Sequence, residues 1–291
     1  MKEKLKLIIT SITLLAVINT SCSNKAINEK TISVSILPQK YFLERICGDE
    51  YKINVLIPPG ENPATCELTS KQIKTLLNSK LYFSIGYLPY ETTHIKNVLE
   101  KNNHVQHINL SQDMDLIRDM LEHGDHYHEG GIDPHIWTSP ENVKLMCESI
   151  YETLIKTYPK DNELFTTNFD QLMSEIVSLD VEIANILESK KDRNFMIYHP
   201  ALTYFARDYG LNQISIEYEG KSPSPKYIKE IIETAKESNV KIVFVQKQFD
   251  LKKAEFIAKE IGGKVIPVDP LNADWMAEMK QLTDILDKNL E

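Results

Sequence analysis

The middle of the chain contains a long run without proline or glycine, DNELFTTNFDQLMSEIVSLDVEIANILESK (residues 161–190). Apolar side chains recur along it at intervals of three or four residues: Phe165, Phe169, Leu172, Ile176, Leu179, Ile183 and Ile186. This spacing places them on one face of an α-helix. At 1.5 Å per residue the helix would be roughly 45 Å long, more than one small domain needs. We therefore predict a helix that links two lobes.

On both sides of this run, short β-prone segments alternate with helix-like segments. Before it, strands are expected at residues 32–37, 51–57, 81–85 and 105–110, and helices at 39–47, 70–77, 90–101 and 140–157, with Ser70 and Ser139 as N-caps of the second and last helices. After it, strands are expected at 194–198, 213–216, 240–245 and 264–268, and helices at 201–209, 224–238, 251–261 and 274–288. This alternation predicts an α/β fold of two lobes with parallel β/α units. The predicted boundaries are 31–159 for the N-terminal lobe, 160–191 for the linking helix and 192–291 for the C-terminal lobe.

The composition is that of an ordinary globular protein. Of the 291 residues, 42% are hydrophobic and 26% are charged, and the net charge is −9. An acidic balance argues against general nucleic-acid binding and suits a protein that binds cations.

The N-terminus has the features of an export signal. Lys2, Lys4 and Lys6 precede an apolar run over residues 7–18, which is shorter than the roughly 20 residues that span a bilayer. Cys22 follows small residues, as in a bacterial lipoprotein signal, although Asn19 fits that pattern poorly. We expect residues 1–21 to be the signal peptide, Cys22 to carry a lipid and residues 22–30 to be a tether. The alternatives are a simply secreted protein and an uncleaved anchor.

Three further cysteines remain after Cys22: Cys47, Cys66 and Cys147. An odd number in an exported protein leaves at least one free thiol or an intermolecular bond. A Cys47–Cys66 disulfide is one alternative, and three half-buried small residues is the simpler interpretation.

Histidines gather shortly before the linking helix. His123, His126, His128 and His135 lie within a few residues of one another, among glycines and acidic residues. Imidazole is the commonest protein ligand for zinc and related ions. The first three are expected in a flexible loop that collects a metal ion, and the alternative is a solvated loop with adventitious binding.

Three potential metal ligands stand where an expected strand or helix meets a loop beside a proline. His135 follows Pro134, His199 precedes Pro200 and Asp269 precedes Pro270. Ligands of parallel sheets bind beyond the carboxyl ends of the strands. Two imidazoles and a carboxylate form a reasonable ligand set for Zn²⁺. Singly, each histidine could instead be an ordinary core residue, and the aspartate a cap or turn residue.

Several motifs make the chain similar to a known family. They are Pro59-Gly60 with Glu67, Asp133-Pro-His135-Ile-Trp137 with Ser139-Pro140-Glu141-Asn142, His199-Pro-Ala-Leu-Thr-Tyr-Phe-Ala206 with Tyr209-Gly210, Ser222-Pro-Ser-Pro225, Val245–Phe249 and Val268-Asp269-Pro270-Leu271. The chain resembles the metal-binding solute-binding proteins of zinc and manganese ABC importers. The resemblance implies two α/β lobes joined by a rigid helix, with one metal ion in the inter-lobe cleft. It also implies that His135, His199 and Asp269 occupy three of the family's four ligand positions. The His-rich loop and the histidine at 199, where manganese-type members usually carry glutamate, indicate the zinc-type branch.

The fourth ligand position departs from the family pattern. The family places a histidine directly after Pro63, and this chain has Ala64 there. Water or a loop histidine, His126 or His128, is favoured to complete the site, and the alternatives are Glu61, Cys66 and Glu67. A second departure is Gln246-Lys247, where the family often has Glu-Pro.

These features predict an extracytoplasmic, membrane-anchored receptor, a monomer, that captures Zn²⁺ or another divalent ion such as Mn²⁺ and delivers it to an ABC permease. The alternatives are a surface adhesin or metal-storage lipoprotein and, less favoured, a metallohydrolase. No motif such as His-Glu-x-x-His supplies a general base, so we predict no enzymatic activity.

Overall fold

The structure is a computed structural model that describes residues 28–102, 104–123, 126–217 and 223–291, with only the backbone for 28–29 and 119–130. The expected signal peptide and Cys22 therefore lie outside the described residues. Within the described part, no helix is both long and apolar enough to cross a membrane.

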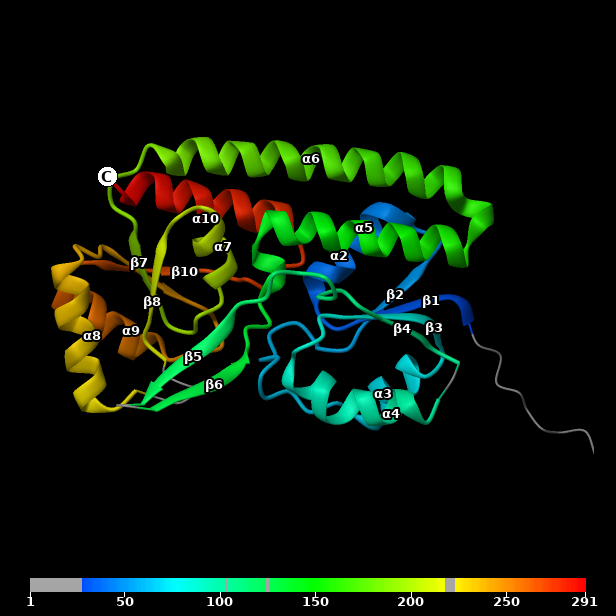
Figure 1. Cartoon of the computed structure of the whole chain (residues 1–291), viewed down its shortest axis with the longest axis horizontal. Coiled ribbons are helices and arrows are strands. Elements are labelled where there is room, and N and C mark those ends of the chain that lie inside the picture. The colour runs from blue at the N-terminus through cyan, green and yellow to red at the C-terminus, as the bar shows by residue number, and fades with distance from the viewer. Residues whose placement is uncertain (1–27, 103, 124–125, 218–222) are drawn as a thin grey trace, which may run out of the picture.

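The N-terminal lobe is a parallel sheet with helices packed on it (Figure 1). Its four strands are arranged in the order β2-β1-β3-β4. In chain order the elements are β1 (Asn28–Val34), α2 (Leu37–Cys47), β2 (Lys52–Val55), α3 (Ser70–Leu76), β3 (Ser79–Ser84), the π-helical turn η1 (Glu91–Ile95), α4 (Lys96–Glu100) and β4 (Gln106–Asn109). Strand β3 is buried along nearly its whole length, as expected for an inner strand covered on both faces.

The C-terminal lobe has the same construction. Its parallel strands are arranged in the order β10-β9-β7-β8. The elements are β7 (Asn194–Ile197), α7 (Thr203–Asp208), β8 (Asn212–Ser215), α8 (Pro225–Glu237), β9 (Ile242–Val245), α9 (Leu251–Ile261), β10 (Lys264–Pro267) and α10 (Trp275–Asn289). Two parallel β/α lobes confirm the predicted fold class.

The predicted linking helix is present as α6 (Asn162–Glu188), which extends over both lobes (Figure 1). It packs against α2 of the first lobe, against α10 of the second, and against α5 (Pro140–Thr157), which precedes it. The expected apolar face is buried, including Phe165, Leu172, Ile176, Leu179 and Ile183. Burial of this one face fixes the helix along the molecule.

The two lobes share one hydrophobic core. A single cluster of buried side chains runs from Ile32 and Phe83 in the first sheet, through Ile176 of α6, to Phe244 and Trp275 in the second lobe. A separate cluster, which includes Met196 and Val243, belongs to the C-terminal lobe alone. Because interiors are densely packed, a continuous core holds the lobes at a fixed spacing.

Two tryptophans connect the lobes at the cleft. Trp137, in the 3₁₀ turn η2 (Ile136–Thr138), donates its indole N–H to the Pro270 carbonyl at 2.7 Å. Trp275 donates to the Trp137 carbonyl, also at 2.7 Å, and its ring meets Phe42 of α2 edge-on at 5.2 Å. Each indole is almost fully buried and has its one donor satisfied.

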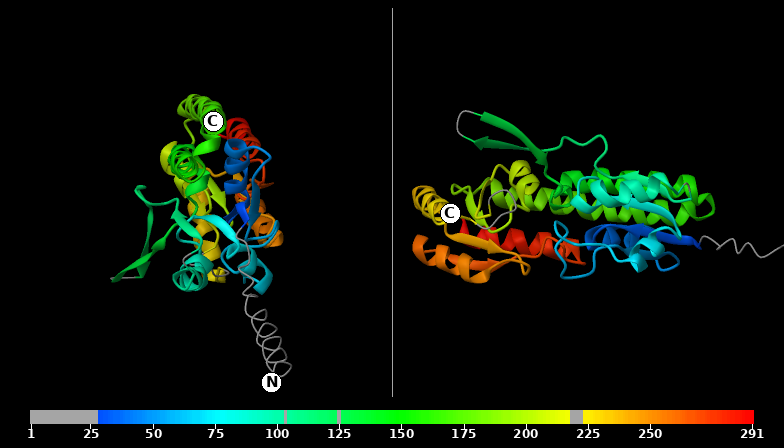
Figure 2. Two further views of the ribbon diagram at one scale, coloured as in Figure 1. Left: turned by 90° about the vertical axis from the view of Figure 1, so that its right-hand side faces the viewer. Right: turned by 90° about the horizontal axis from the view of Figure 1, so that it is seen from below.

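Three local expectations were wrong. β1 begins at Asn28, inside the predicted tether, because its backbone continues to pair with β3. Helix α3 is capped by Thr69 rather than Ser70, since the Thr69 hydroxyl accepts from the Gln72 N–H. The expected flexible loop contains an antiparallel hairpin of β5 (Arg118–His123) and β6 (His126–Ile132), which stands away from the body (Figure 2). In the sequence, the dipeptide Gly124-Asp125 between the segments that form β5 and β6 is itself a hairpin signal.

The three described cysteines are free, so the alternative of a Cys47–Cys66 disulfide is not realised. Cys47 and Cys147 are buried and Cys66 is partly buried. Burial raises the pKa of Cys47 to about 12, which keeps it a neutral thiol.

Two N-cap serines allow a matched test of the hydrogen bond between Ser139 and Asp208, which joins the two lobes. The Ser139 hydroxyl caps α5 by accepting from Asn142 N–H at 3.0 Å, and it also donates to Asp208 of the other lobe. Ser224 caps α8 alone, at an exposed position. We expect Ser224→Ala to lower the free energy of unfolding by about 1 kcal/mol and Ser139→Ala by about 2–3 kcal/mol, because the latter loses an inter-lobe bond as well. Urea denaturation measures both, and equal losses would show that the Asp208 contact adds nothing.

Candidate metal centre

The carboxyl ends of both sheets face one cavity of about 590 Å³ between the lobes. From the N-terminal lobe, the segments after β2 and β3 contribute Ala64 and Tyr87, among others. From the C-terminal lobe, the segments after β7 and β10 contribute His199 and Asp269. His135, which follows β6, completes the wall. The site therefore lies where the topology of parallel sheets places ligands.

His135 is oriented by the aspartate two residues before it. Asp133 Oδ1 accepts from the His135 backbone N–H at 2.8 Å and from ring Nδ1 at 2.7 Å. The Asp133 carbonyl in turn accepts from the Tyr204 hydroxyl at 2.9 Å. Burial alone would raise the pKa of Asp133, but the charge and hydrogen bonds of His135 bring it below its usual range. An ionised carboxylate accepts only, so His135 carries its proton on Nδ1 and its Nε2 is free to bind.

His199 is oriented in the same way by a residue of the next strand. Its ring Nδ1 lies 2.6 Å from Glu217 Oε2, just beyond the end of β8. Gln246 fixes the backbone, because its amide accepts from His199 N–H at 3.3 Å and donates to the His199 carbonyl at 2.8 Å. The ring also stacks on Phe249 at 5.1 Å. These contacts leave Nε2 of His199 directed at the cavity.

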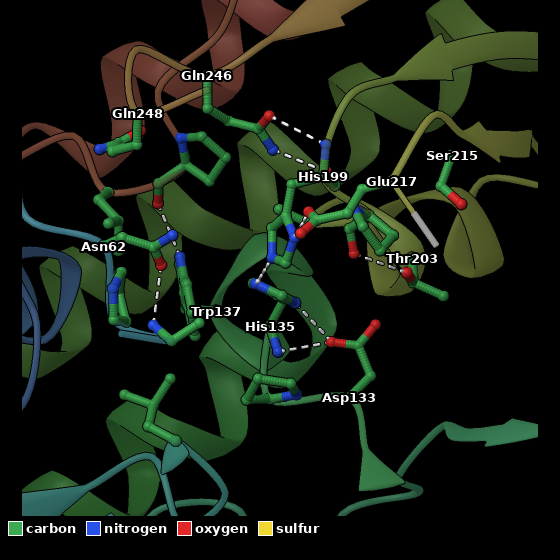
Figure 3. Close-up of a pocket in the computed structure, with 18 of the residues that line it drawn as sticks. Asn62, Asp133, His135, Trp137, His199, Thr203, Ser215, Glu217, Gln246 and Gln248 are labelled. Atoms are coloured by element: carbon green, nitrogen blue, oxygen red, sulfur yellow. Dashed lines mark hydrogen bonds and ion pairs between the residues drawn. The ribbon is translucent and has the colours of Figure 1, made fainter. Parts of the chain in front are cut away.

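The two Nε2 atoms meet 3.3 Å apart (Figure 3). Since each Nδ1 bears the proton, two neutral rings would point lone pairs at one another. That arrangement is unfavourable unless a proton or a metal ion lies between them. Two nitrogens bound at roughly 2.05 Å to a tetrahedral zinc are about 3.3 Å apart, so the observed spacing fits a shared Zn²⁺. A carboxylate on the far nitrogen of each ring is also the usual support for a metal-binding histidine.

Asp269 lies on the same cavity but interacts with a lysine. Its Oδ2 is 3.5 Å from Lys247 Nζ, and its Oδ1 accepts from the Leu271 N–H at 3.2 Å. Glu278 accepts from the Asp269 backbone N–H at 2.8 Å and so fixes the position of the residue. Among the side chains that the structure describes, no three His, Cys, Asp or Glu residues are placed together to hold a metal ion.

The other predicted ligands divide into two groups. Ala64 lines the cavity, at the position where a histidine was expected, whereas Glu61, Cys66 and Glu67 do not line it. Burial and the negative charge of Glu61 raise the pKa of Cys66, which makes it a poor ligand. The side chains of His123, His126 and His128 lie outside the described part, although the backbone pairs His123 with His126 in the hairpin.

Four side chains of the candidate site have no role predicted from the sequence. Asp133 belongs to a predicted motif without a role of its own, and no role is predicted for Glu217. Both stand next to a strand end, which is the signal that could have found them. Gln246 and Lys247 were noticed only as departures from a family pattern. The structure shows that Gln246 holds His199 and that Lys247 pairs with Asp269.

Two parallel β/α lobes with a cavity and a pair of histidines between them are the construction of a two-lobed solute-binding protein. The profile of one family, described as ZnuA, the periplasmic component A of a zinc-uptake complex, matches residues 32–291, so the chain belongs to that family. The prediction of an extracytoplasmic metal-binding receptor for an ABC importer is thereby confirmed. The family is one of receptors and not of catalysts.

Comparison with individual relatives supports this family assignment. A crystal structure of ZnuA superposes with a TM-score of 0.81 at 35% identity, over 90% of this chain and 99% of that one. A zinc-bound deletion mutant of ZnuA gives a TM-score of 0.79 at 36% identity, over 89% of this chain and 97% of that one. The zinc-binding protein AdcA of Streptococcus pyogenes is 26% identical over the whole of this chain, which spans 61% of AdcA's length.

The carboxylate behind His199 gives a direct test of the site. We expect Glu217→Gln to weaken Zn²⁺ binding about 10- to 100-fold, because a neutral amide supports the ring nitrogen less well. Competition against a chromophoric chelator measures the change. The matched control is Glu233→Gln, which removes the same charge from an exposed position on α8. Equal affinities in the two variants would contradict the role of Glu217.

Lys247 offers a test in the opposite direction. Its ammonium is largely exposed and would compete with a metal cation bound by Asp269. An exposed charge pair is worth up to about 1 kcal/mol, so we expect Lys247→Met to tighten Zn²⁺ binding up to about fivefold. Lys247→Arg keeps the charge and should leave the affinity unchanged. Weaker binding in Lys247→Met would show that the lysine supports the site instead.

Proposed function

We propose that the chain captures Zn²⁺ between Nε2 of His135 and Nε2 of His199, and that Asp269 joins them when the ion displaces Lys247. The bound ion is then delivered to the permease of an ABC importer. The observation that carries this proposal is the 3.3 Å separation of the two Nε2 atoms. The other nitrogen of each ring, Nδ1, is held by a carboxylate.

The donor set favours zinc over manganese. Imidazole nitrogen suits Zn²⁺, whereas Mn²⁺ prefers carboxylate, carbonyl and water oxygens, and the general affinity order places Mn²⁺ lowest. With two imidazoles and at most one carboxylate, the site supplies more nitrogen than an oxygen-seeking ion would use.

The remaining coordination position is filled by water or by a histidine of the β5–β6 hairpin. Zinc accepts three protein ligands and a water, as open sites show. Ala64 leaves that position open toward the cavity, which is consistent with either alternative.

The protein acts as a monomer, anchored by a lipid on Cys22 after removal of residues 1–21. The basic start, the short apolar run and the cysteine support this part of the proposal. Residues 28–159 and 192–291 form the two lobes, and 160–191 joins them.

Release of the ion depends on local movement. The continuous core through α6 opposes a wide hinge opening, so the loops that carry His199 and Asp269 are the parts that move.

Removing one imidazole tests the central claim. We expect His135→Ala to lower Zn²⁺ affinity by more than the roughly 100-fold that loss of a supporting carboxylate can cost, since a direct ligand is lost. Calorimetric titration of the metal-free protein with Zn²⁺ and with Mn²⁺ measures this. His94→Ala, at an exposed position on η1, is the control and should bind as the parent does. Unchanged Zn²⁺ binding in His135→Ala would refute the proposal.

Deleting residues 123–129 separates the two candidates for the open position. If water completes the site, the tight Zn²⁺ site persists and only additional weak binding disappears. Loss of the tight site, in a variant whose circular dichroism and thermal unfolding match the parent, would assign the position to a hairpin histidine.

A further inference from the structure

The cavity in front of the histidine pair is much larger than a zinc ion needs. Its volume is about 590 Å³. This lies within the range of sites for small organic molecules, about 300–1,000 Å³. A water molecule takes up about 30 Å³ of the liquid, so an ion with one or two waters would occupy a small part of the space.

The walls have the chemistry of an organic ligand site. Apolar side chains from both lobes line most of the cavity: Pro63, Leu88 and Pro89 on one side and Phe249, Pro270 and Leu271 on the other. Amide groups face it from opposite lobes, Asn62 from the first and Gln248 from the second (Figure 3). Sites for small molecules typically combine apolar walls with a few fixed polar groups, whereas a site for a bare ion encloses it in donor atoms.

The described side chains supply too few donors for the ion. Only the two imidazoles converge, and Asp269 is paired with Lys247. At residue 64 the chain places a methyl group in the cavity wall. When Asp269 joins the two imidazoles, the ion has three protein ligands. Zinc can also expand to five ligands, so two positions face the open part of the cavity.

We propose that the cavity takes Zn²⁺ as a complex with a small bidentate amino-carboxylate, such as a free α-amino acid. This rests on the proposed zinc-binding function and names the form in which the ion is carried. The amine nitrogen and one carboxylate oxygen of the chelator fill the two open positions. Its side chain packs against the apolar walls. Its polar groups can contact Gln248 and the NH₂ group of Asn62, whose Oδ1 already accepts from the Ala64 N–H.

A zinc ion bound with water alone would not account for the volume of the cavity or for its apolar walls. Water gains nothing from the apolar walls, and it would occupy a space sized for several non-hydrogen atoms of a ligand. A chelator also supplies both donor atoms in one molecule, so binding of the first brings the second to the ion. Two separate waters do not have this advantage.

The test compares Zn²⁺ binding with and without L-histidine as the probe chelator, at a free Zn²⁺ concentration held constant by a metal buffer. We expect L-histidine to raise the apparent Zn²⁺ affinity by at least about tenfold. Native mass spectrometry should show protein, zinc and histidine in equal numbers. N-acetyl-L-histidine, whose amine is blocked, is the matched control and should have no effect.

Two variants of Ala64 sharpen the test, and because this residue is exposed they should fold normally. Ala64→His supplies a third imidazole. This variant should bind Zn²⁺ tightly without L-histidine, and no L-histidine should stay bound to it. Ala64→Phe fills the space without adding a donor, and L-histidine should then no longer raise its Zn²⁺ affinity.

The outcomes separate this inference from the proposed function. Equal Zn²⁺ affinity with and without L-histidine, with no histidine retained, would overturn the inference and leave a zinc receptor with a hydrated ion. Absence of zinc under both conditions would overturn both proposals.

Discussion

The proposed metal centre depends on two imidazole nitrogens from different lobes that meet at 3.3 Å. Neither lobe can make that pair alone. His135 belongs to the segment that leads into α5, and His199 leaves the second sheet. Their separation is therefore set by whatever fixes the lobes, which is the shared core along α6 and the hydrogen bonds of Trp137 and Trp275. A shift of one ångström between the lobes would change the geometry more than zinc tolerates.

Electrostatic support for the pair is built in the same symmetrical way. Asp133 and Glu217 each hold one Nδ1–H, so both rings present a lone pair to the same point. The two carboxylates would compensate the charge of a bound dication without being its ligands. Lys247 then places a positive charge beside Asp269, the remaining acidic group of this wall. In the proposed site, two supported imidazoles would attract the ion and Lys247 would compete with it for Asp269.

The sequence predicted the architecture well, for physical reasons that act locally. The spacing of Phe165 to Ile186 defines a helix without reference to the rest of the chain, and alternating strands and helices imply parallel sheets. His135, His199 and Asp269 could be placed where a strand or helix meets a loop, and the structure puts all three on one cavity. The contacts behind them could not be predicted. Glu217 reaches His199 only through the pairing of β7 with β8, and Lys247 reaches Asp269 only through the pairing of β9 with β10.

The position of α10 has a consequence for how the protein matures after export. Trp275 at its start packs on Phe42 of the first lobe, and the helix lies along α6, which joins the lobes. Yet α10 follows every other helix and strand in the chain. Domains generally fold in the order in which they emerge, N-terminal first. Here the first lobe cannot complete its core in that order, because part of that core is encoded at the other end of the sequence. The first lobe therefore completes its core only when α10 is in place, and folding of the two lobes is completed together.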